Sequence, residues 1–265
     1  MAGGSQDSLW AGYCGDFLRL LDRSGDLPAF LRGGASGASV APHTEGTTVI
    51  AVKYRDGVIN VGDRRATAEN FVLYDRADKI LPLDDYTLIA VSGSYARAME
   101  AVRLLRHSFE YYRRSQLQEI SLEGKLSEVT RLLAASAAES SGPQAVMLPL
   151  LSAYDRQRGE GRLFFYDALG ARFESAEFGA AGSGSHRIRG AFDYIVKTKG
   201  PFHQMTFNQA LREALVLLDI AAELDAATGG LEKVPPTVKA VCAEGIRELS
   251  EDEVLKHVRK LKGGS

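Results

Sequence analysis

The sequence has few of the features that would place the protein outside a reduced, aqueous compartment. Its two cysteines, Cys14 and Cys242, lie far apart and match neither a metal-ligand spacing nor a disulfide framework. No uninterrupted apolar run reaches membrane-spanning length. The N-terminus also lacks the basic and then apolar segments of a secretory signal. We therefore expect a cytoplasmic protein with no membrane partner, and we expect neither a metal nor another cofactor.

Charge of either sign is not in excess. The formal net charge is −2, which gives no electrostatic reason to expect a nucleic acid or an anionic membrane as partner. Hydrophobic residues make up 45% and charged residues 25% of the 265 residues, which are ordinary globular values. The chain can form one large domain or two small ones, and it contains no internal repeat.

The first 46 residues differ in character from the rest. Residues 16–21 have the pattern of a short amphipathic helix, with Trp10 as a nearby apolar anchor. Residues 33–39 are mostly glycine, alanine and serine and predict a flexible linker. On composition alone, this region is either a disordered tail or a removable leader.

From residue 47 onward the pattern predicts strands and helices in alternating groups. Asp56-Gly57 and Asp84-Asp85 indicate two hairpin turns, and Thr206 with Gln209 predicts a capping box. We expect strands at 47–54, 58–62, 79–83, 86–92, 145–154, 162–167, 171–178, 238–242 and 245–249. We expect helices around 98–112, 122–133, 186–197 and 207–225 and after Ser250. This order predicts an α+β fold with two antiparallel sheets packed face to face and helices outside.

The transition into the first strand is Gly46-Thr47-Thr48. A threonine hydroxyl is too weakly acidic to attack an amide unaided, and one solution is for the residue's own free α-amine to act as base. That amine has an ordinary pKa of roughly 7.7–8.0, which suits a base at working pH. Thr47 is therefore a candidate nucleophile that becomes competent once Gly46 is cut away. Alone, the same residues also fit a loop that enters a strand.

Several further motifs follow Thr47 in a fixed order. They are Gly62-Asp63-Arg64-Arg65, Asp78-Lys79-Ile80, Ser92-Gly93-Ser94, Gly182-Ser183-Gly184-Ser185 and the segment from Asp225 to Gly230. This set resembles the β subunits of the 20S proteasome core, in the bacterial (actinobacterial) form. The resemblance runs from Thr47 to about Gly230, and the leader adds Asp16-Phe17-Leu18-Arg19.

The resemblance implies a four-layer αββα sandwich of the N-terminal-nucleophile hydrolase type. It implies that residues 1–46 are a propeptide and residues 47–265 the catalytic domain, separated by self-cleavage between Gly46 and Thr47. The protein would be a threonine endopeptidase that degrades unfolded proteins to peptides. Its partners would be a heptameric β ring stacked on a second one, proteasome α-type subunits, an ATP-dependent unfoldase ring and polypeptide substrates.

The resemblance also assigns roles to individual residues. The catalytic group comprises Thr47, Asp63, Lys79, Gly93, Ser183 and Asp225. Lys79 would favour deprotonation of the threonine hydroxyl, Asp63 would be its counter-ion, and the Gly93 N–H would face the oxyanion. The substrate-binding group comprises Thr67, Ala66, Ala77, Val91 and Gly93, and its small apolar members imply an apolar side chain before the cut.

Three alternatives stay open at this point. The same fold could form a non-catalytic wall of the ring, or an N-terminal-nucleophile amidohydrolase acting on small amides. Gly182-Ser183-Gly184-Ser185 before a helix could also cradle a phosphate, although it lacks the lysine and spacing of a P-loop. Tyr95 departs from the family pattern, which has a small or aliphatic residue there. Its ring could pack under the first helix or narrow the substrate cleft.

Overall fold

The computed structural model describes residues 48–68, 71–139, 147–231 and 233–262, together with Leu21 and Gly25. Apart from Leu21, the expected leader helix lies outside the described residues, as do the linker, Gly46 and Thr47.

The first sheet contains the strand that follows the candidate nucleophile. Its order is β10-β1-β2-β11-β12, and every neighbouring pair is antiparallel. The strands are β1 (Thr48–Tyr54), β2 (Gly57–Gly62), β10 (Phe178–Gly182), β11 (Thr237–Cys242) and β12 (Gly245–Glu248). Strands β1 and β2 form the expected hairpin around Asp56. Both are buried on both faces because this sheet lies between helices and a second sheet.

The second sheet has the order β5-β6-β7-β8-β9 and is also antiparallel throughout. Its strands are β5 (Ile80–Asp84), β6 (Thr87–Gly93), β7 (Met147–Asp155), β8 (Glu160–Tyr166) and β9 (Arg172–Ser175). The hairpin around Asp84 and Asp85 is confirmed. One end of β5 and β6 carries this turn, and the other end carries Lys79 and Gly93.

The prediction of one strand over 171–178 is wrong. The segment forms β9 at the edge of the second sheet and then β10 at the edge of the first. The change of sheet occurs at Ser175, whose hydroxyl donates to the Phe178 carbonyl at 2.5 Å and accepts from the Phe178 N–H at 3.2 Å. Phe178 then stacks on Phe192 of the helix Ser185–Lys199, with ring centroids 4.1 Å apart. The sequence carries no turn signal at this change, because neither glycine nor proline stands between the two strands.

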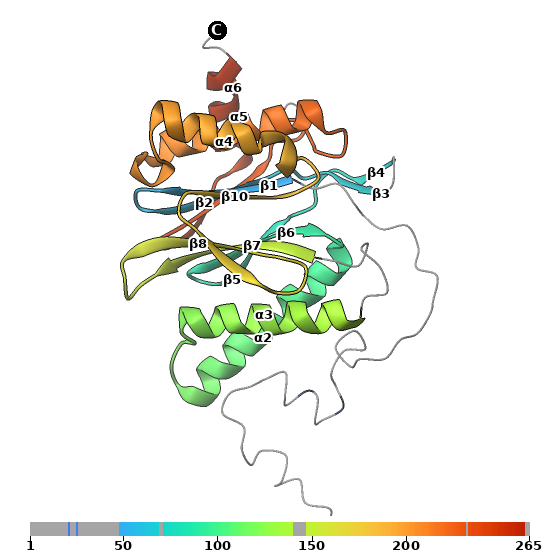
Figure 1. Ribbon diagram of the computed structural model, residues 1–265, viewed down its shortest axis with the longest axis vertical. Helices are drawn as coiled ribbons and strands as arrows, with labels where there is room; N and C mark the ends of the chain where they lie inside the picture. The colour runs from blue at the N-terminus through green and yellow to red at the C-terminus, as the bar shows by residue number, and fades with distance from the viewer. Residues whose placement is uncertain are drawn as a thin grey trace, which may run out of the picture.

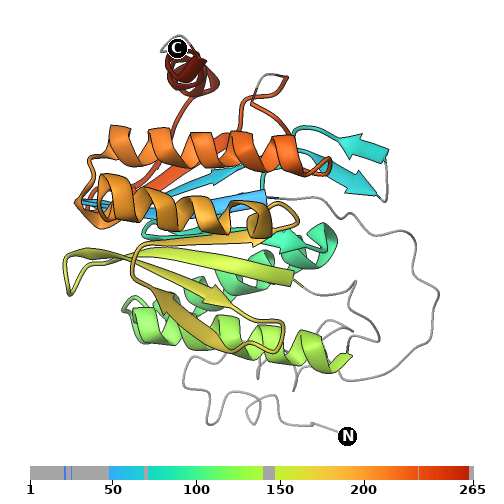
Figure 2. The ribbon, with the colours of Figure 1, turned by 45° about the horizontal axis from the view of Figure 1, so that its top comes forward.

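Helices cover the outer face of each sheet. Helices α4 (Ser185–Lys199) and α5 (Phe207–Leu224) and the short helix η4 (Phe202–Gln204) pack on the first sheet, and α2 (Tyr95–Gln116) and α3 (Leu122–Glu139) on the second. Helix α6 (Glu251–Lys262) follows β12. Figure 1 shows the layers from α5 through both sheets to α3, and Figure 2 shows them after rotation. The expected αββα sandwich is therefore confirmed.

The layer between the sheets is apolar with a few polar exceptions. Val49, Ile80 and Leu88 are fully buried there. One buried polar pair crosses this layer, because the Ser152 hydroxyl of β7 donates to Asn60 Oδ1 of β2 at 2.8 Å. Such a bond helps to fix how the two sheets face each other, since a displaced partner would leave a buried polar group unsatisfied.

A short hairpin was not expected from the sequence. Strands β3 (Ala66–Ala68) and β4 (Phe71–Tyr74) form a two-stranded sheet of their own, which extends beyond the two main sheets in both views (Figures 1 and 2). Both strands are too short to give a clear alternating pattern.

The capping box of α5 is confirmed, because Gln209 Oε1 accepts from the Thr206 N–H at 2.9 Å. Within the described ranges, no helix combines the length and the apolar character needed to cross a membrane.

Candidate active site

The site begins where β1 starts, at the end of β2 and just before β5. Asp63 follows β2 and Lys79 precedes β5, so the two side chains come from different sheets. Lys79 Nζ lies 2.9 Å from Asp63 Oδ1, and the Lys79 and Asp63 side chains are only 1% and 0% exposed. The sequence prediction that these two residues pair is supported by this geometry.

Asp63 is saturated with hydrogen-bond donors. Its Oδ1 accepts from the Thr48 N–H at 2.8 Å and from Lys79, and its Oδ2 accepts from the N–H groups of Arg65 and Gly229, each at 3.0 Å. A buried carboxylate needs such partners because an unpaired buried charge is costly. Asp63 therefore joins the start of β1, the lysine and the loop after α5 in one rigid arrangement.

Lys79 is held on several sides. Its ammonium also donates to the Arg65 carbonyl, and its own carbonyl accepts from the Val91 N–H at 2.8 Å. Burial lowers the pKa of Lys79 below its ordinary value of 10.5, against the opposing attraction of Asp63. The site thus presents a fixed, poorly hydrated cation beside the first residues of the strand.

A second set of hydrogen bonds reaches the side chain of Thr48. Asp225 Oδ2 accepts from the hydroxyls of Ser183 and Thr228, each at 2.5 Å. Thr228 Oγ1 lies 2.6 Å from Thr48 Oγ1, which also accepts from the Gly184 N–H at 3.1 Å. Burial alone would raise the pKa of Asp225, but hydrogen bonds from the two hydroxyls and the Ala227 N–H, together with nearby Arg187, hold this pKa below its usual range.

Gly184 has no room for a side chain. A Cβ at this position would lie 2.5 Å from Thr48 Oγ1 and 2.9 Å from Thr228 Oγ1. The glycine-rich segment therefore serves close contact with β1, and this contact disfavours its interpretation as a phosphate cradle. Ser183, beside Gly184, is exposed and directly follows Gly182, which pairs with Thr48 at the start of β1.

Thr228 was missed by the sequence analysis. It is only 1% exposed and connects Asp225 to Thr48, which makes it part of the network. The available signal was a hydroxyl residue shortly after Asp225, in a glycine-rich loop that follows a helix. Arg65 was also given no role. Its guanidinium donates to the Ala226 carbonyl at 2.9 Å and so holds the same loop against the turn after β2.

The expected substrate-binding residues lie around the same end of the sheets. Gly93 ends β6 with a φ of 87°, which favours glycine, and Thr67 lies on β3. The Thr67 hydroxyl is buried and has no hydrogen-bond partner among the described residues. The remaining three, Ala66, Ala77 and Val91, are 8%, 3% and 2% exposed, and Val91 packs in the cluster beneath α2.

Tyr95 is the first residue of α2, and its hydroxyl donates to the Asp78 carbonyl at 3.2 Å. Its ring therefore connects the start of the helix to the segment that carries Lys79. Burial raises the pKa of Tyr95, and Asp78 and Tyr74 raise it further. The hydroxyl is thus a hydrogen-bond donor at neutral pH.

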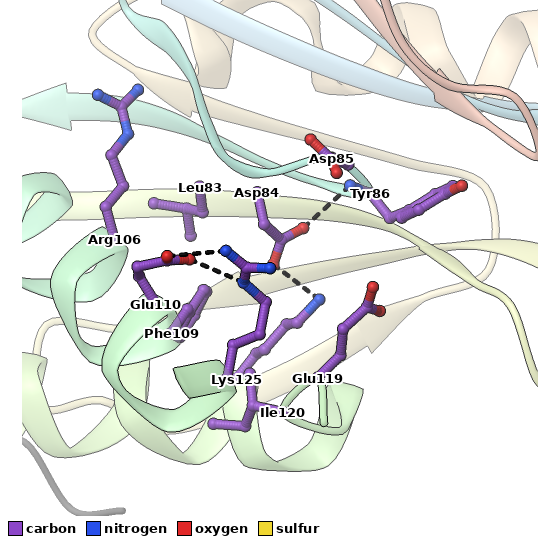
Figure 3. Close-up of a pocket in the computed structure, with 11 residues that line it drawn as sticks. Leu83, Asp84, Asp85, Tyr86, Arg106, Phe109, Glu110, Glu119, Ile120 and Lys125 are labelled. Atoms are coloured by element: carbon purple, nitrogen blue, oxygen red, sulfur yellow. Dashed lines mark hydrogen bonds and ion pairs between the residues drawn. The ribbon is translucent and has the colours of Figure 1, made fainter. Parts of the chain in front are cut away.

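Other polar regions of the described chain lie elsewhere. A cavity of about 420 Å³ lies between the turn at Asp84 and Asp85 and the facing ends of α2 and α3 (Figure 3). It is therefore at the opposite end of β5 and β6 from Lys79 and Gly93. No group of three or more His, Cys, Asp or Glu side chains within the described ranges is arranged to hold a metal ion.

Two facing antiparallel sheets between helices, with a buried Lys–Asp pair beside the first strand, define an α+β sandwich of the N-terminal-nucleophile hydrolase type. Residues 43–234 match the model of the family described as proteasome subunit. The chain therefore belongs to the proteasome subunit family.

Curated relatives agree with this membership. The chain is 34% identical over 253 residues to "Proteasome subunit beta 2" of Thermomonospora curvata, a match that covers 93% of this chain and 88% of the relative. It is 33% identical over 254 residues to "Proteasome subunit beta" of Streptomyces griseus, covering 93% and 86%. The "Proteasome subunit beta" of Acidothermus cellulolyticus is 35% identical over 221 residues, covering 80% and 73%. The expected resemblance to actinobacterial β subunits is confirmed, and it implies a subunit of a proteasome core assembly.

Proposed function

We propose that this chain is a catalytic β subunit, a threonine-type endopeptidase that degrades unfolded proteins to peptides after self-cleavage between Gly46 and Thr47. The observation that carries the proposal is the buried Lys79–Asp63 pair, whose carboxylate also accepts from the Thr48 N–H at 2.8 Å. That nitrogen is bonded directly to the carbonyl carbon of Thr47. A residue attached at this point is within reach of the lysine.

Self-cleavage would separate a propeptide, residues 1–46, from a catalytic domain, residues 47–265. The Thr47 hydroxyl oxygen attacks the Gly46 carbonyl carbon, the Gly46–Thr47 C–N bond breaks, and the nitrogen takes a proton to become the free α-amine. Water then hydrolyses the resulting ester, which leaves a carboxylate on Gly46 and restores the hydroxyl. The precursor is a zymogen, because its base does not exist before this reaction.

Peptide hydrolysis would use the same hydroxyl with the new α-amine as base. The amine accepts the hydroxyl proton, the oxygen bonds to the substrate carbonyl carbon, and the leaving amine takes the proton as its C–N bond breaks. Water then hydrolyses the resulting ester, which releases the first part of the substrate as a carboxylate and restores the Thr47 hydroxyl. Lys79 favours the deprotonated hydroxyl through its charge. Ser183 and Asp225 orient the α-amine, while the Gly93 N–H stabilises the oxyanion, a contribution typically worth about 3–4 kcal/mol.

Substrate would bind as an added strand. The Thr67 hydroxyl is buried without a partner among the described residues, so a peptide main chain that bonds to it removes an unsatisfied group. Ala66, Ala77 and Val91 form the surroundings of the side chain before the cut. Their small apolar surfaces favour an apolar side chain there.

The assembly would enclose this chemistry. We propose homo-heptameric β rings stacked in pairs, closed by α-type rings and served by an ATP-dependent unfoldase in the cytoplasm. The names of the relatives support a proteasome β subunit. A closed chamber would admit only unfolded chains and would protect other proteins from an unselective nucleophile.

The test compares Thr47→Ala with Thr198→Ala in the full chain, scored by intact mass and by hydrolysis of a short apolar peptide. Thr47→Ala should assemble, retain residues 1–46 and hydrolyse nothing. Thr198→Ala removes an exposed hydroxyl of α4 that donates to the Tyr194 carbonyl of the same helix, so processing at Gly46 should continue. If Thr47→Ala still loses its leader in a protease-free preparation, Thr47 is not the nucleophile. If the wild-type assembly is inactive although its leader is gone, the chain is a structural wall subunit.

A further inference from the structure

Two consecutive residues of opposite charge, Asp78 and Lys79, each form an ion pair with a residue of the first sheet or its loops. Lys79 reaches Asp63 after β2 at 2.9 Å, while Asp78 Oδ2 accepts from Lys239 Nζ of β11 at 2.7 Å. Strands β2 and β11 are neighbours in that sheet. The segment before β5 is therefore connected to the other sheet by both of its charged side chains.

Lys239 is placed for this contact by its position on β11. It lies opposite Asn60 of β2, whose side chain crosses the layer between the sheets to Ser152. Directly paired residues share a face of the sheet, so Lys239 also points toward the second sheet. The Lys239 side chain is 5% exposed, and its second acidic neighbour, Glu248, is farther away at 3.6 Å.

Asp78 receives two further hydrogen bonds. Its backbone carbonyl accepts from the Tyr95 hydroxyl at 3.2 Å, and its Oδ1 accepts from the Ile80 N–H, also at 3.2 Å. Asp78 is thus held from β11, from the start of α2 and from β5. We call Asp78, Lys239 and Tyr95 the Asp78 brace.

We propose that the Asp78 brace positions Lys79 for catalysis, so that Lys239 and Tyr95 are positioning residues of the reaction. The inference rests on the proposed function, in which Lys79 acts on the Thr47 hydroxyl. The brace fixes the peptide next to Lys79 at the point where the chain enters β5. The lysine ammonium cannot shift away from Asp63 unless this peptide moves or the side chain changes rotamer.

The brace contributes little to stability by itself. The Asp78 side chain is 43% exposed, and ion pairs with a solvent-exposed partner stabilise proteins weakly because water screens them. Placement of a catalytic group has a much larger effect, since a misplacement of about 1 Å can cost about 100-fold in rate. Loss of the brace should therefore be visible in turnover before it is visible in folding.

The test uses Lys239→Met in the full chain, assembled as the wild type is, with a fluorogenic short apolar peptide as substrate. We expect kcat to fall about ten- to 100-fold and KM to stay within about twofold of wild type. Leader removal, followed by intact mass, should slow as well, because it uses the same lysine. Lys239→Arg restores the charge and should recover part of kcat.

The matched control is Lys125→Met. Lys125 of α3 is also buried and lies 2.7 Å from Asp84 Oδ2, but at the other end of β5 (Figure 3). This variant removes an equally short Lys–Asp pair without disturbing the Asp78 segment. It should leave kcat and KM unchanged while thermal stability falls about as much as in Lys239→Met.

Tyr95→Phe provides an independent arm because it removes one hydroxyl and keeps the ring. It should lower kcat about two- to tenfold with KM unchanged, and it reports on the brace even if Lys239→Met does not fold. If Lys239→Met folds with an unchanged kcat, or if only KM rises in either variant, the positioning role is wrong. An unprocessed or inactive wild type would instead contradict the proposed function.

Discussion

A buried lysine paired with an aspartate lies at each end of strand β5. The two pairs have similar N–O distances, but their side chains differ in exposure and in the hydrogen bonds around them. At one end Lys79 lies 2.9 Å from Asp63, with both side chains at most 1% exposed. At the other end Lys125 lies 2.7 Å from Asp84, with 10% and 27% of the side chains exposed, beside a cavity (Figure 3).

The difference lies in how completely the carboxylates are satisfied. Asp63 accepts from three backbone N–H groups in addition to the lysine, and they come from three separate segments. Asp84 accepts from the Tyr86 N–H at 2.9 Å within its own turn, and Lys125 has a second partner in Thr87 at 3.2 Å. A short ion-pair distance therefore does not identify a catalytic group. A buried charge that accepts hydrogen bonds from several distant segments is a better indication of a functional site.

The largest expected effect comes from removing each lysine in turn. Lys79→Ala should abolish leader removal and peptide hydrolysis, with activity reduced by about 1,000-fold or more, because both proposed reactions depend on the charge of Lys79. Lys125→Ala should keep near-normal activity. Intact mass and steady-state peptide hydrolysis measure both. A Lys79→Ala particle that assembles and stays active would remove the distinction between the two ends of β5.

Replacing Asp63 or Asp84 by asparagine should lower the free energy of unfolding by different amounts. Asp63→Asn introduces an amide that cannot accept all four donors and leaves Lys79 as a buried unpaired charge, which should cost about 3–5 kcal/mol. Asp84→Asn should cost no more than about 1 kcal/mol, because its pair is partly exposed. Denaturant unfolding of the full chain gives both values. Equal losses would show that burial is not what distinguishes the pairs.

The sequence analysis identified more residues of the Lys79–Asp63 end of β5 than of the Lys125–Asp84 end. Asp63 and Lys79 were found through the resemblance to proteasome β subunits, and the hairpins were found through local turn residues such as Asp56 and Asp84. Local chemistry determines the turns, so a single sequence carries them. The architecture of two facing sheets followed from the order of strands and helices.

Features that depend on packing were missed. No glycine or proline marks the change of sheet at Ser175, and the hairpin of β3 and β4 is too short to show an alternating pattern. Thr228 and Lys239 owe their contacts to residues that are distant in sequence, Thr48 and Asp78. Sequence spacing within one segment cannot reveal such pairs, because tertiary packing determines which faces meet.

The pH dependence of activity should show the lowered pKa of Lys79. Activity should rise as the α-amine of Thr47 loses its proton, at roughly pH 7.7–8.0, and should fall as Lys79 loses its charge at a pH below 10.5. Between the lowered pKa and 10.5 the unfolded chain binds more protons, so the Lys79 contribution to unfolding free energy rises with pH. Alkaline loss of activity should therefore precede loss of fold, as measured by hydrolysis and circular dichroism.

Lys125→Ala provides the control for this profile and should keep both limbs where the wild type has them. An alkaline limb at the ordinary lysine pKa, or one that coincides with unfolding, would contradict the assignment of that limb to Lys79.

The smallest expected effect concerns salt. Salt screens interactions between exposed charges over distances beyond about 10 Å at 0.1 M ionic strength and beyond about 3 Å at 1 M, but ions penetrate a dry pair poorly. A double-mutant cycle on Lys125 and Asp84, with alanine at each position, should give a coupling energy of about 0.5–1 kcal/mol at low salt. This coupling should fall to about half or less at 1 M salt, because the Asp84 side chain is 27% exposed and open to ions. The corresponding cycle on Lys79 and Asp63, measured by unfolding of the unprocessed chain, should change little over the same range. If both couplings fall in parallel, solvent reaches Lys79 as easily as Lys125, and the catalytic end of β5 is not the dry one.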